Sequence, residues 1–231
     1  MARTGKKYAK GKEEIKKEFY SLEEAVPLLK KVAYAKFNES VEMAFLLGVD
    51  PKHADQMVRG TLILPHGTGK TKKVLVIASG EKLKEAESAG ADHTGGAEVI
   101  GKIQGGWVDF EAVIATPDMM KEVGKLGKVL GPKGLMPNPK TGTVTFDVAK
   151  AVSEIKGGKI EFRVDKTSII HSVIGRISFD EKQLIENARS LVAAILKARP
   201  ASAKGKYLRS VYLTSTMSPS FKIDPATIEA T

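Results

Sequence analysis

The chain has 231 residues, with 37 lysines and arginines against 27 acidic residues, which gives a formal net charge of +10 at pH 7. It has no cysteine, so a disulfide scaffold, a thiolate metal site and a cysteine nucleophile are excluded. No apolar run reaches the roughly 18 residues of a membrane span. The basic N-terminus also lacks the apolar segment of a secretory signal. We therefore expect a cytoplasmic protein that contacts no membrane and whose partner is a polyanion.

The first part of the chain is expected to contain a basic arm, one helix and two strands. Residues 1–17 carry seven lysines and arginines, which favours a mobile arm. Ser21, with a glutamate three residues later, forms a capping box, and the apolar spacing that follows predicts a helix to about residue 34. Alternation over residues 40–49 predicts a strand, and residues 61–64 predict a second, short strand.

The middle part changes character at residue 68. Two continuous apolar runs are typical of strands buried on both faces, as in a parallel sheet covered by helices. Between and after them the pattern alternates strand and helix. The expected elements are strands at 73–78, 112–115 and 143–146, helices at 81–89, 97–104, 117–126 and 148–156, and a loop at 124–142, where eight of nineteen residues are glycine or proline.

The last part returns to alternating strands and one long helix. Residues 159–164 and 169–177 alternate, and the four residues between them suit a hairpin turn. Asp180 caps a helix that ends at Pro200. Residues 207–214 predict the final strand.

Together these elements predict an α/β protein with a discontinuous domain. Residues 1–67 and 158–231 are expected to form one α+β domain with a split sheet. Residues 68–157 are expected to form a small Rossmann-like α/β domain inserted into it. Glycines at both junctions suit hinges between the two domains.

Enzyme chemistry finds little support in the residues. Gly69-Lys70-Thr71 resembles the end of a phosphate-binding P-loop, but the earlier glycine of that motif is missing and a strand follows where a helix is required. The inserted domain lacks the G-x-G-x-x-G of dinucleotide-binding folds. The four histidines have no metal-ligand spacing. We expect no catalytic residue, no metal and no cofactor, and a nucleotide-dependent enzyme that uses the insert remains the rival hypothesis.

Nucleic-acid binding is favoured by two observations. Residues 1–17 hold seven lysines and arginines against two glutamates, and residues 124–142 and 189–222 contain basic residues but no acid, so all three blocks can contact phosphates. Residues 214–220 are rich in hydroxyl groups, which can bond ribose and base edges. Read alone, this second segment also fits an ordinary Ser/Thr turn at the end of a strand.

Two stretches resemble a known family: Gly127-Lys-Val-Leu-Gly-Pro-Lys-Gly-Leu-Met-Pro-Asn-Pro139 and Thr214-Ser-Thr-Met217. With four shorter motifs in the family's order, they make the chain similar to the bacterial large-subunit ribosomal protein family called L-one, over nearly its whole length. The resemblance implies a non-enzymatic protein that is a monomer when free and joins other ribosomal components. It also implies binding to the ribosomal RNA of the mobile stalk beside the exit tRNA site, help in releasing deacylated tRNA, and repression of its own operon mRNA.

The resemblance also implies where RNA is contacted. Lysines and arginines would neutralise phosphates, hydroxyl groups would bond ribose or bases, and Phe37 and Met217 would pack on sugar or base faces. Many family members have glycine where this chain has Ser218, so a strained conformation is a possibility to test there. The implied RNA-binding residues are Lys36, Phe37, Glu39, Ser40, Arg163, Asp165, Lys166, Thr167, His171, Thr214, Thr216, Met217 and Ser218. Secondary RNA or tRNA contacts are expected at Lys125, Lys128, Lys133 and Lys140.

Overall fold

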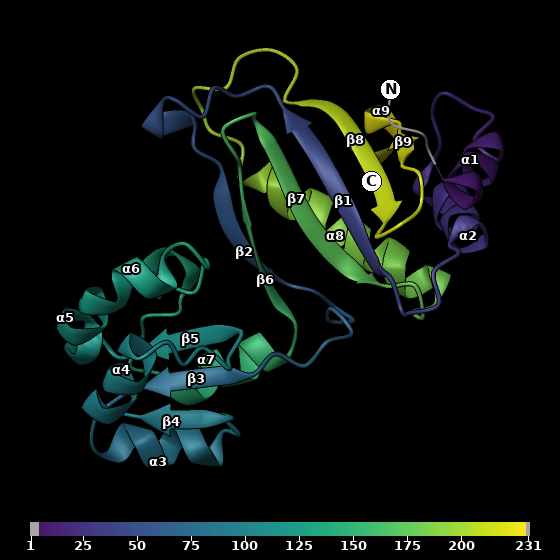
Figure 1. The fold of residues 1–231 in the computed structure, drawn as a ribbon. Helices are drawn as coiled ribbons and strands as arrows, with labels where there is room; N and C mark the ends of the chain where they lie inside the picture. Colours follow the sequence, from purple (N-terminus) through teal and green to yellow (C-terminus); the bar gives the residue numbers. More distant parts are fainter. Residues whose placement is uncertain (1–4, 230–231) are drawn as a thin grey trace. The chain divides into compact units, whose positions relative to one another are not determined.

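The computed structural model describes residues 5–229, which divide into two compact units. One is built from the two ends of the chain, up to residue 69 and from residue 160 onward, and the other comprises residues 70–159 (Figure 1). The α/β class expected from the sequence is confirmed. Within residues 5–229, no helix combines the length and the apolar character needed to span a membrane.

The first unit is organised around a four-stranded antiparallel sheet in the order β7-β1-β8-β9, with a separate two-stranded sheet of β2 and β6. Its helices are α1 (Lys6–Glu13), α2 (Leu22–Val32), α8 (Glu181–Lys197) and α9 (Pro225–Glu229). Its strands are β1 (Ser40–Leu47), β2 (Arg59–Ile63), β6 (Lys159–Arg163), β7 (Ile169–Arg176), β8 (Leu208–Ser215) and β9 (Phe221–Ile223), and a short turn, η1, covers Ala54–Gln56.

The two long helices of this unit, α2 and α8, begin where the sequence predicts. The Ser21 side chain accepts a bond from the Glu24 amide at the start of α2. Asp180 and Gln183 form a capping box at the start of α8. Caps of this kind satisfy amides that have no partner within the helix. The apolar stripes of both helices then pack in one core with alternate residues of the sheet.

Only one face of the four-stranded sheet is covered. In β1 the odd-numbered residues are buried and the even-numbered ones are half-buried, because side chains alternate between faces. Figure 1 looks onto this sheet with α8 behind it, so the uncovered face is the near one. We call it the open face.

The second unit has a parallel three-stranded sheet in the order β4-β3-β5, with apolar clusters on both faces. Such burial on both sides explains the unbroken apolar runs of its strands. The elements are β3 (Val74–Ile77), α3 (Glu81–Ser88), β4 (His93–Gly95), α4 (Ala97–Gln104), β5 (Ala112–Ala115), η2 (Pro117–Met119), α5 (Met120–Val123), η3 (Gly124–Leu126), α6 (Gly127–Leu130), η4 (Pro139–Thr141) and α7 (Val148–Lys156).

Several expectations about local structure were wrong. Residues 6–13 form α1 and not a mobile arm, while residues 1–4 of the predicted arm lie outside the described residues. The predicted loop 124–142 contains three helical turns, because Leu126 and Leu130 are buried in the core of the second unit. The predicted strand 143–146 is reduced to one bridge, between Val144 and Ala115.

The predicted hairpin is also wrong. Although residues 165–168 form a turn, the strands on either side pair elsewhere: β6 with β2, and β7 with β1. β4, β9 and α9 were not predicted at all. Gly69, one of the glycines expected to act as a hinge, is closely packed. A Cβ at this position would come within 2.7 Å of the Phe179 ring and 2.9 Å of the Arg176 side chain.

Candidate RNA interface

Two loops at one end of the open face carry exposed apolar side chains. Phe37 lies in the loop before β1 and is 56% exposed, and Met217 lies in the loop after β8 and is 47% exposed. The neighbours Lys36 and Thr216 are exposed as well. Because β1 and β8 are paired in antiparallel fashion, with Val41 opposite Ser215, the structure brings these two loops together.

Both loops are held by the carboxylate of Glu39, which is only 1% exposed. Its Oε2 accepts bonds from the Ser215 hydroxyl (2.6 Å) and the Met217 amide (3.0 Å). Its Oε1 accepts a bond from the Ala35 amide (3.0 Å). Glu39 was expected to contact RNA directly; a carboxylate so buried and so fully bonded instead fixes the positions of the loops that carry Phe37 and Met217.

The ionised form of Glu39 is favoured by these bonds. Burial alone would raise the pKa of the carboxyl group, because desolvation penalises the charge. Donation from Ser215, Met217, Ala35 and Tyr34 outweighs this effect and leaves the pKa below its usual value. The loop pair is therefore built around a buried negative charge.

Thr216 also joins the two loops. The Ser40 amide donates to the Thr216 hydroxyl (3.1 Å), and the Thr216 amide donates to the Ser40 carbonyl (3.1 Å). The hydroxyl group remains at the surface, and an oxygen of this type has two lone pairs, so it can accept a second bond. Thr216 thus has both a structural bond and a surface position.

Ser218 is buried (7% exposed), so it is not a surface contact as expected. Its hydroxyl group accepts a bond from the Ser215 amide (3.1 Å) and lies 2.8 Å from the Ser215 hydroxyl. Among the described residues, Ser168 is the only non-glycine residue with a positive φ. Ser218 therefore has ordinary backbone geometry, and the strain considered from the sequence is not present.

Replacing Ser218 by glycine is therefore expected to destabilise the protein by about 1–2 kcal/mol. The change removes hydrogen bonds and increases the freedom of the unfolded chain. Chemical denaturation measures the effect, and Ser220→Gly, an exposed site in the same segment, is the control. Equal or greater stability of the Ser218 variant would contradict the bonded role of this hydroxyl group.

The open face of the sheet extends the candidate RNA interface beyond the two loops. Tyr212 and His171 are exposed near its centre, and Lys222 of β9 lies opposite Tyr212. Tyr212 and Glu42 were not predicted, and Lys222 was expected only as part of the basic block 189–222, although their positions in alternating strands identify the face once the pairing is known. Three rows cross β7, β1 and β8: Val173, Glu42 and Thr214; His171, Ala44 and Tyr212; Ile169, Leu46 and Ser210.

The turn between β6 and β7 lies at the other end of the sheet. β1 has eight residues, so at about 3.4 Å per residue this turn is roughly 24 Å from the loop pair. Asp165 caps the turn, since its carboxylate accepts bonds from the Ile169 and Thr167 amides and the Thr167 hydroxyl, and these bonds lower its pKa. Lys166 and Arg163 remain exposed. Asp165 and Thr167 thus shape the turn.

The second unit carries the other predicted cations. Lys125, Lys128, Lys133 and Lys140 are all exposed. The segment that bears them is fixed by its apolar residues and by Asn138, whose carbonyl accepts bonds from Thr141 and Thr143. Apolar anchors that point inward leave these four lysines on the outside of an ordered segment.

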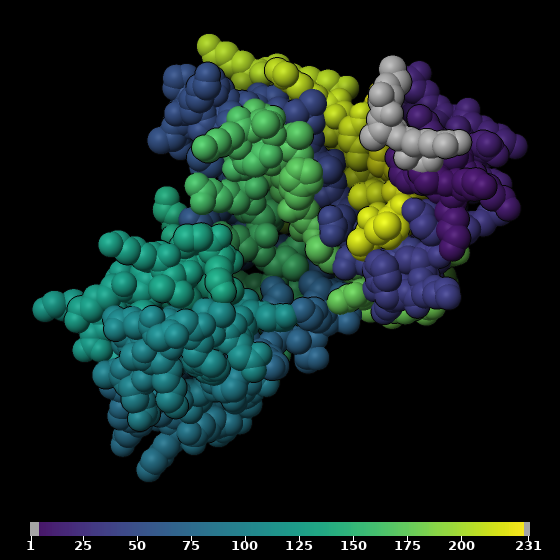
Figure 2. All heavy atoms as spheres, in the orientation of Figure 1, coloured from purple at the N-terminus to yellow at the C-terminus, as the bar shows by residue number. Residues whose placement is uncertain are grey.

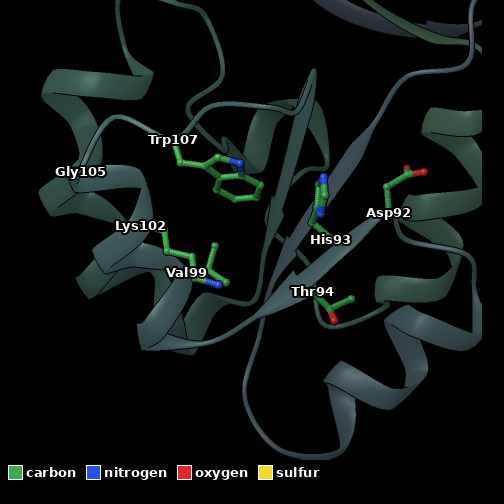
Figure 3. Close-up of a pocket in the computed structure, with 7 residues that line it drawn as sticks. All are labelled: Asp92, His93, Thr94, Val99, Lys102, Gly105 and Trp107. Atoms are coloured by element: carbon green, nitrogen blue, oxygen red, sulfur yellow. The ribbon is translucent and has the colours of Figure 1, made fainter.

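A hollow of about 590 Å³ also lies in the second unit, beside β4 and α4. Figure 3 shows the Trp107 and His93 side chains that line it, whose rings pack edge to face with centroids 5.0 Å apart, and Lys102 and Val99 nearby. In parallel sheets nucleotides bind beyond the carboxyl ends of the central strands, where a helix N-terminus meets phosphate. Here the acidic Glu81 occupies the first turn of α3, and the hollow lies at an edge strand. This arrangement does not favour the rival nucleotide-dependent enzyme.

Comparison with known proteins agrees with the motifs that carry the resemblance. A family model described as "Ribosomal protein L1p/L10e family" matches residues 29–219. The chain belongs to this family. It is 63% identical over 228 residues to the large ribosomal subunit protein uL1 of Solibacter usitatus (strain Ellin6076), and the match covers 98% of this chain and 96% of the relative. These matches confirm the resemblance of this chain to the bacterial L-one family.

Proposed function

We propose that the protein is a structural, RNA-binding component of the large ribosomal subunit in the cytoplasm. Its RNA target is the ribosomal RNA of the mobile stalk, beside the exit tRNA site. It assists release of deacylated tRNA, and it represses its own operon by binding mRNA at the same surface. Membership of a ribosomal protein family supports the first part, and the surface of the first unit supports the RNA contacts.

The observation that carries this proposal is the loop pair around Glu39. Exposed Phe37 and Met217 project from loops that are fixed by hydrogen bonds to a buried carboxylate. Exposing large apolar side chains to water is unfavourable unless a partner covers them. Unstacked bases and ribose faces in RNA are partners of the right shape for such side chains.

The charges around the loops and the turn support RNA over an apolar partner. Lys36 stands beside Phe37, while Lys166 lies in the turn at the far end of the sheet and Arg163 ends β6 just before that turn. Each can neutralise a phosphate, and the open face between them offers hydroxyl, aromatic and imidazole groups. An RNA that lies along the face would contact both ends.

Thr216→Val tests whether the Thr216 hydroxyl group bonds the RNA. The variant keeps the shape but loses the hydroxyl group, so we expect specific binding of a stalk-like stem with an internal loop to weaken by about 1–3 kcal/mol. Because Ser40 also loses an acceptor, stability is expected to fall by about 1 kcal/mol. Filter retention measures the affinity, and denaturation measures the stability.

Thr216→Ser is the matched control, since it retains the hydroxyl group. We expect it to bind the specific RNA nearly as tightly as the parent. Binding of an unrelated duplex should be the same in all three proteins. A valine variant that binds the specific RNA like the parent would show that this hydroxyl group has no RNA partner.

We assign the main RNA contacts to the first unit and the tRNA contacts to the second. The four lysines at 125–140 support the second assignment. The strands that lead into and out of the second unit, β2 and β6, lie side by side in one sheet. A short link can therefore replace the second unit at little cost in loop entropy.

A chain in which Gly-Ser residues replace 70–159 is expected to fold and to bind the stalk RNA with at most a tenfold loss of affinity. It should fail to promote release of exit-site tRNA on reconstituted ribosomes. Circular dichroism checks the fold, and filter retention checks the RNA. A folded deletion variant that does not bind the RNA would place the main RNA surface in the second unit.

A further inference from the structure

Helix α1 packs against residues that adjoin the two loops of the RNA interface. Gly11 is the buried residue of this helix, and a Cβ at this position would come within 2.7 Å of Val32 Cγ1 and 3.4 Å of Pro219 Cδ. Val32 ends α2 just before the loop with Phe37, and Pro219 directly follows Ser218. In Figure 2, atoms of α1 (purple) and of the C-terminal segment (yellow) meet at the surface.

Two further contacts fix the helix at this place. The Lys7 ammonium lies 5.9 Å from the centroid of the Tyr34 ring, and Tyr34 is two residues before Lys36. Just beyond the helix, Glu14 pairs with Lys31 of α2 at 3.2 Å. An eight-residue helix is marginal alone, so these contacts and the close approach at Gly11 hold it in place.

Among residues 5–229, no ion pair neutralises the lysines of α1. The helix has four lysines and one glutamate, and the lysine side chains are exposed. In the described part of the chain, no carboxylate pairs with Lys6, Lys10 or Lys12. Lys6 and Lys10 are four residues apart, a spacing at which like charges repel on a helix. This cluster lies on a helix that packs against Val32 and Pro219, which adjoin the loops with Phe37 and Met217, and it can bind an external anion.

We propose that α1 is a phosphate-binding flank of the RNA interface. Lys6, Lys10 and Lys12 contact backbone phosphates of the same RNA that meets Phe37 and Met217. This inference rests on the proposed function and assigns the phosphate contacts of the N-terminal block to three lysines of one helix, which are not among the contacts that the resemblance implies. RNA is the partner favoured, because the neighbouring loops expose groups suited to bases and ribose and a polynucleotide presents regularly spaced negative charges to a lysine-rich helix.

The test removes three charges from the full-length protein. Lys6→Gln, Lys10→Gln and Lys12→Gln are combined, and binding of the stalk-like RNA is measured by filter retention at several salt concentrations. We expect the slope of log K against log salt to become shallower by about 2.7, which is 0.9 per phosphate contact. At 100 mM salt the affinity should fall roughly a hundredfold.

A matched variant controls for net charge. Lys84→Gln, Lys150→Gln and Lys182→Gln remove the same charge from exposed sites on α3, α7 and α8. This variant should keep the parental slope. Equal slopes for the α1 variant and this control would overturn the proposal, and so would poly-glutamate binding that needs the α1 lysines while RNA binding does not.

Gly11→Val tests whether position matters as well as charge. The variant keeps every lysine, but the new valine side chain would collide with Val32. We therefore expect α1 to leave its position against α2 and Pro219. We expect a loss of affinity similar to that of the triple variant, with the core still folded by near-UV circular dichroism. Parental binding by Gly11→Val would overturn the proposal. Failure of the parent protein to bind the RNA at all would refute the proposed function itself, a separate outcome.

Discussion

Glu39→Ala is expected to destabilise the protein by about 3 kcal/mol and to abolish specific RNA binding. The substitution leaves the Ser215 hydroxyl and the Met217 and Ala35 amides without their acceptor, and each buried donor left unpaired costs about 1–3 kcal/mol. The loops that present Phe37 and Met217 then lose their common support. Urea denaturation measures the stability, and filter retention at constant salt measures the affinity.

Glu39→Gln separates the charge from the shape. An amide keeps one acceptor oxygen, so we expect roughly half the destabilisation. Because the pKa of Glu39 is lowered in the folded protein, its stabilising effect is present above the ordinary carboxyl value of 4.5 and is lost as the pH falls through the lower folded value. The difference in stability between parent and glutamine variant should therefore shrink in acid. A pH-independent difference, or an alanine variant as stable as the parent, would contradict this role.

RNA affinity is expected to fall about a thousandfold between 50 and 200 mM salt. About six phosphate contacts give a slope near −5 in log K against log salt. The net charge of +10 and the exposed lysines around the interface motivate this value. Filter retention at four or more salt concentrations gives the slope directly.

Lys36→Gln should make that slope shallower by about one, because one phosphate contact is lost. The same change should weaken binding to all RNA sequences alike. A flat salt profile for the parent protein would mean that phosphates contribute little, and the electrostatic part of the proposed interface would then be wrong.

The elements of the fold that local patterns control were predicted well. The helix that begins after Ser21 follows from its cap, and the strand from Ser40 follows from the alternation of its side chains. Each signal is contained in a few neighbouring residues. β4 was missed because its three residues, His93, Thr94 and Gly95, have no apolar alternation. The hairpin was wrong because the partner of β6 is β2, about a hundred residues earlier. Distant pairing leaves little trace in a local pattern.

The site shows the same limit. Phe37 and Met217 were predicted as surface contacts, and both are exposed. Glu39 and Ser218 were assigned to the same surface but are buried, since their burial depends on groups brought in by the pairing of β1 with β8. The basic N-terminal segment was predicted to be mobile from its charge alone. The prediction failed because Gly11 has no side chain, which lets the helix pack closely against Val32 and Pro219.

The pairing of β1 with β8 also sets an order for biosynthesis. Glu39 and Ser215 are 176 residues apart, so the ribosome has made nearly the whole chain before their hydrogen bond can form. Residues 70–159 are contiguous and leave the ribosome before residues 160–231, so the second unit can fold while the first still lacks three strands of its four-stranded sheet, β7, β8 and β9. A truncated product that ends before Ser215 therefore carries a folded second unit without the surface proposed to bind RNA. Under the proposed function, only finished molecules would bind the stalk RNA or repress their own mRNA.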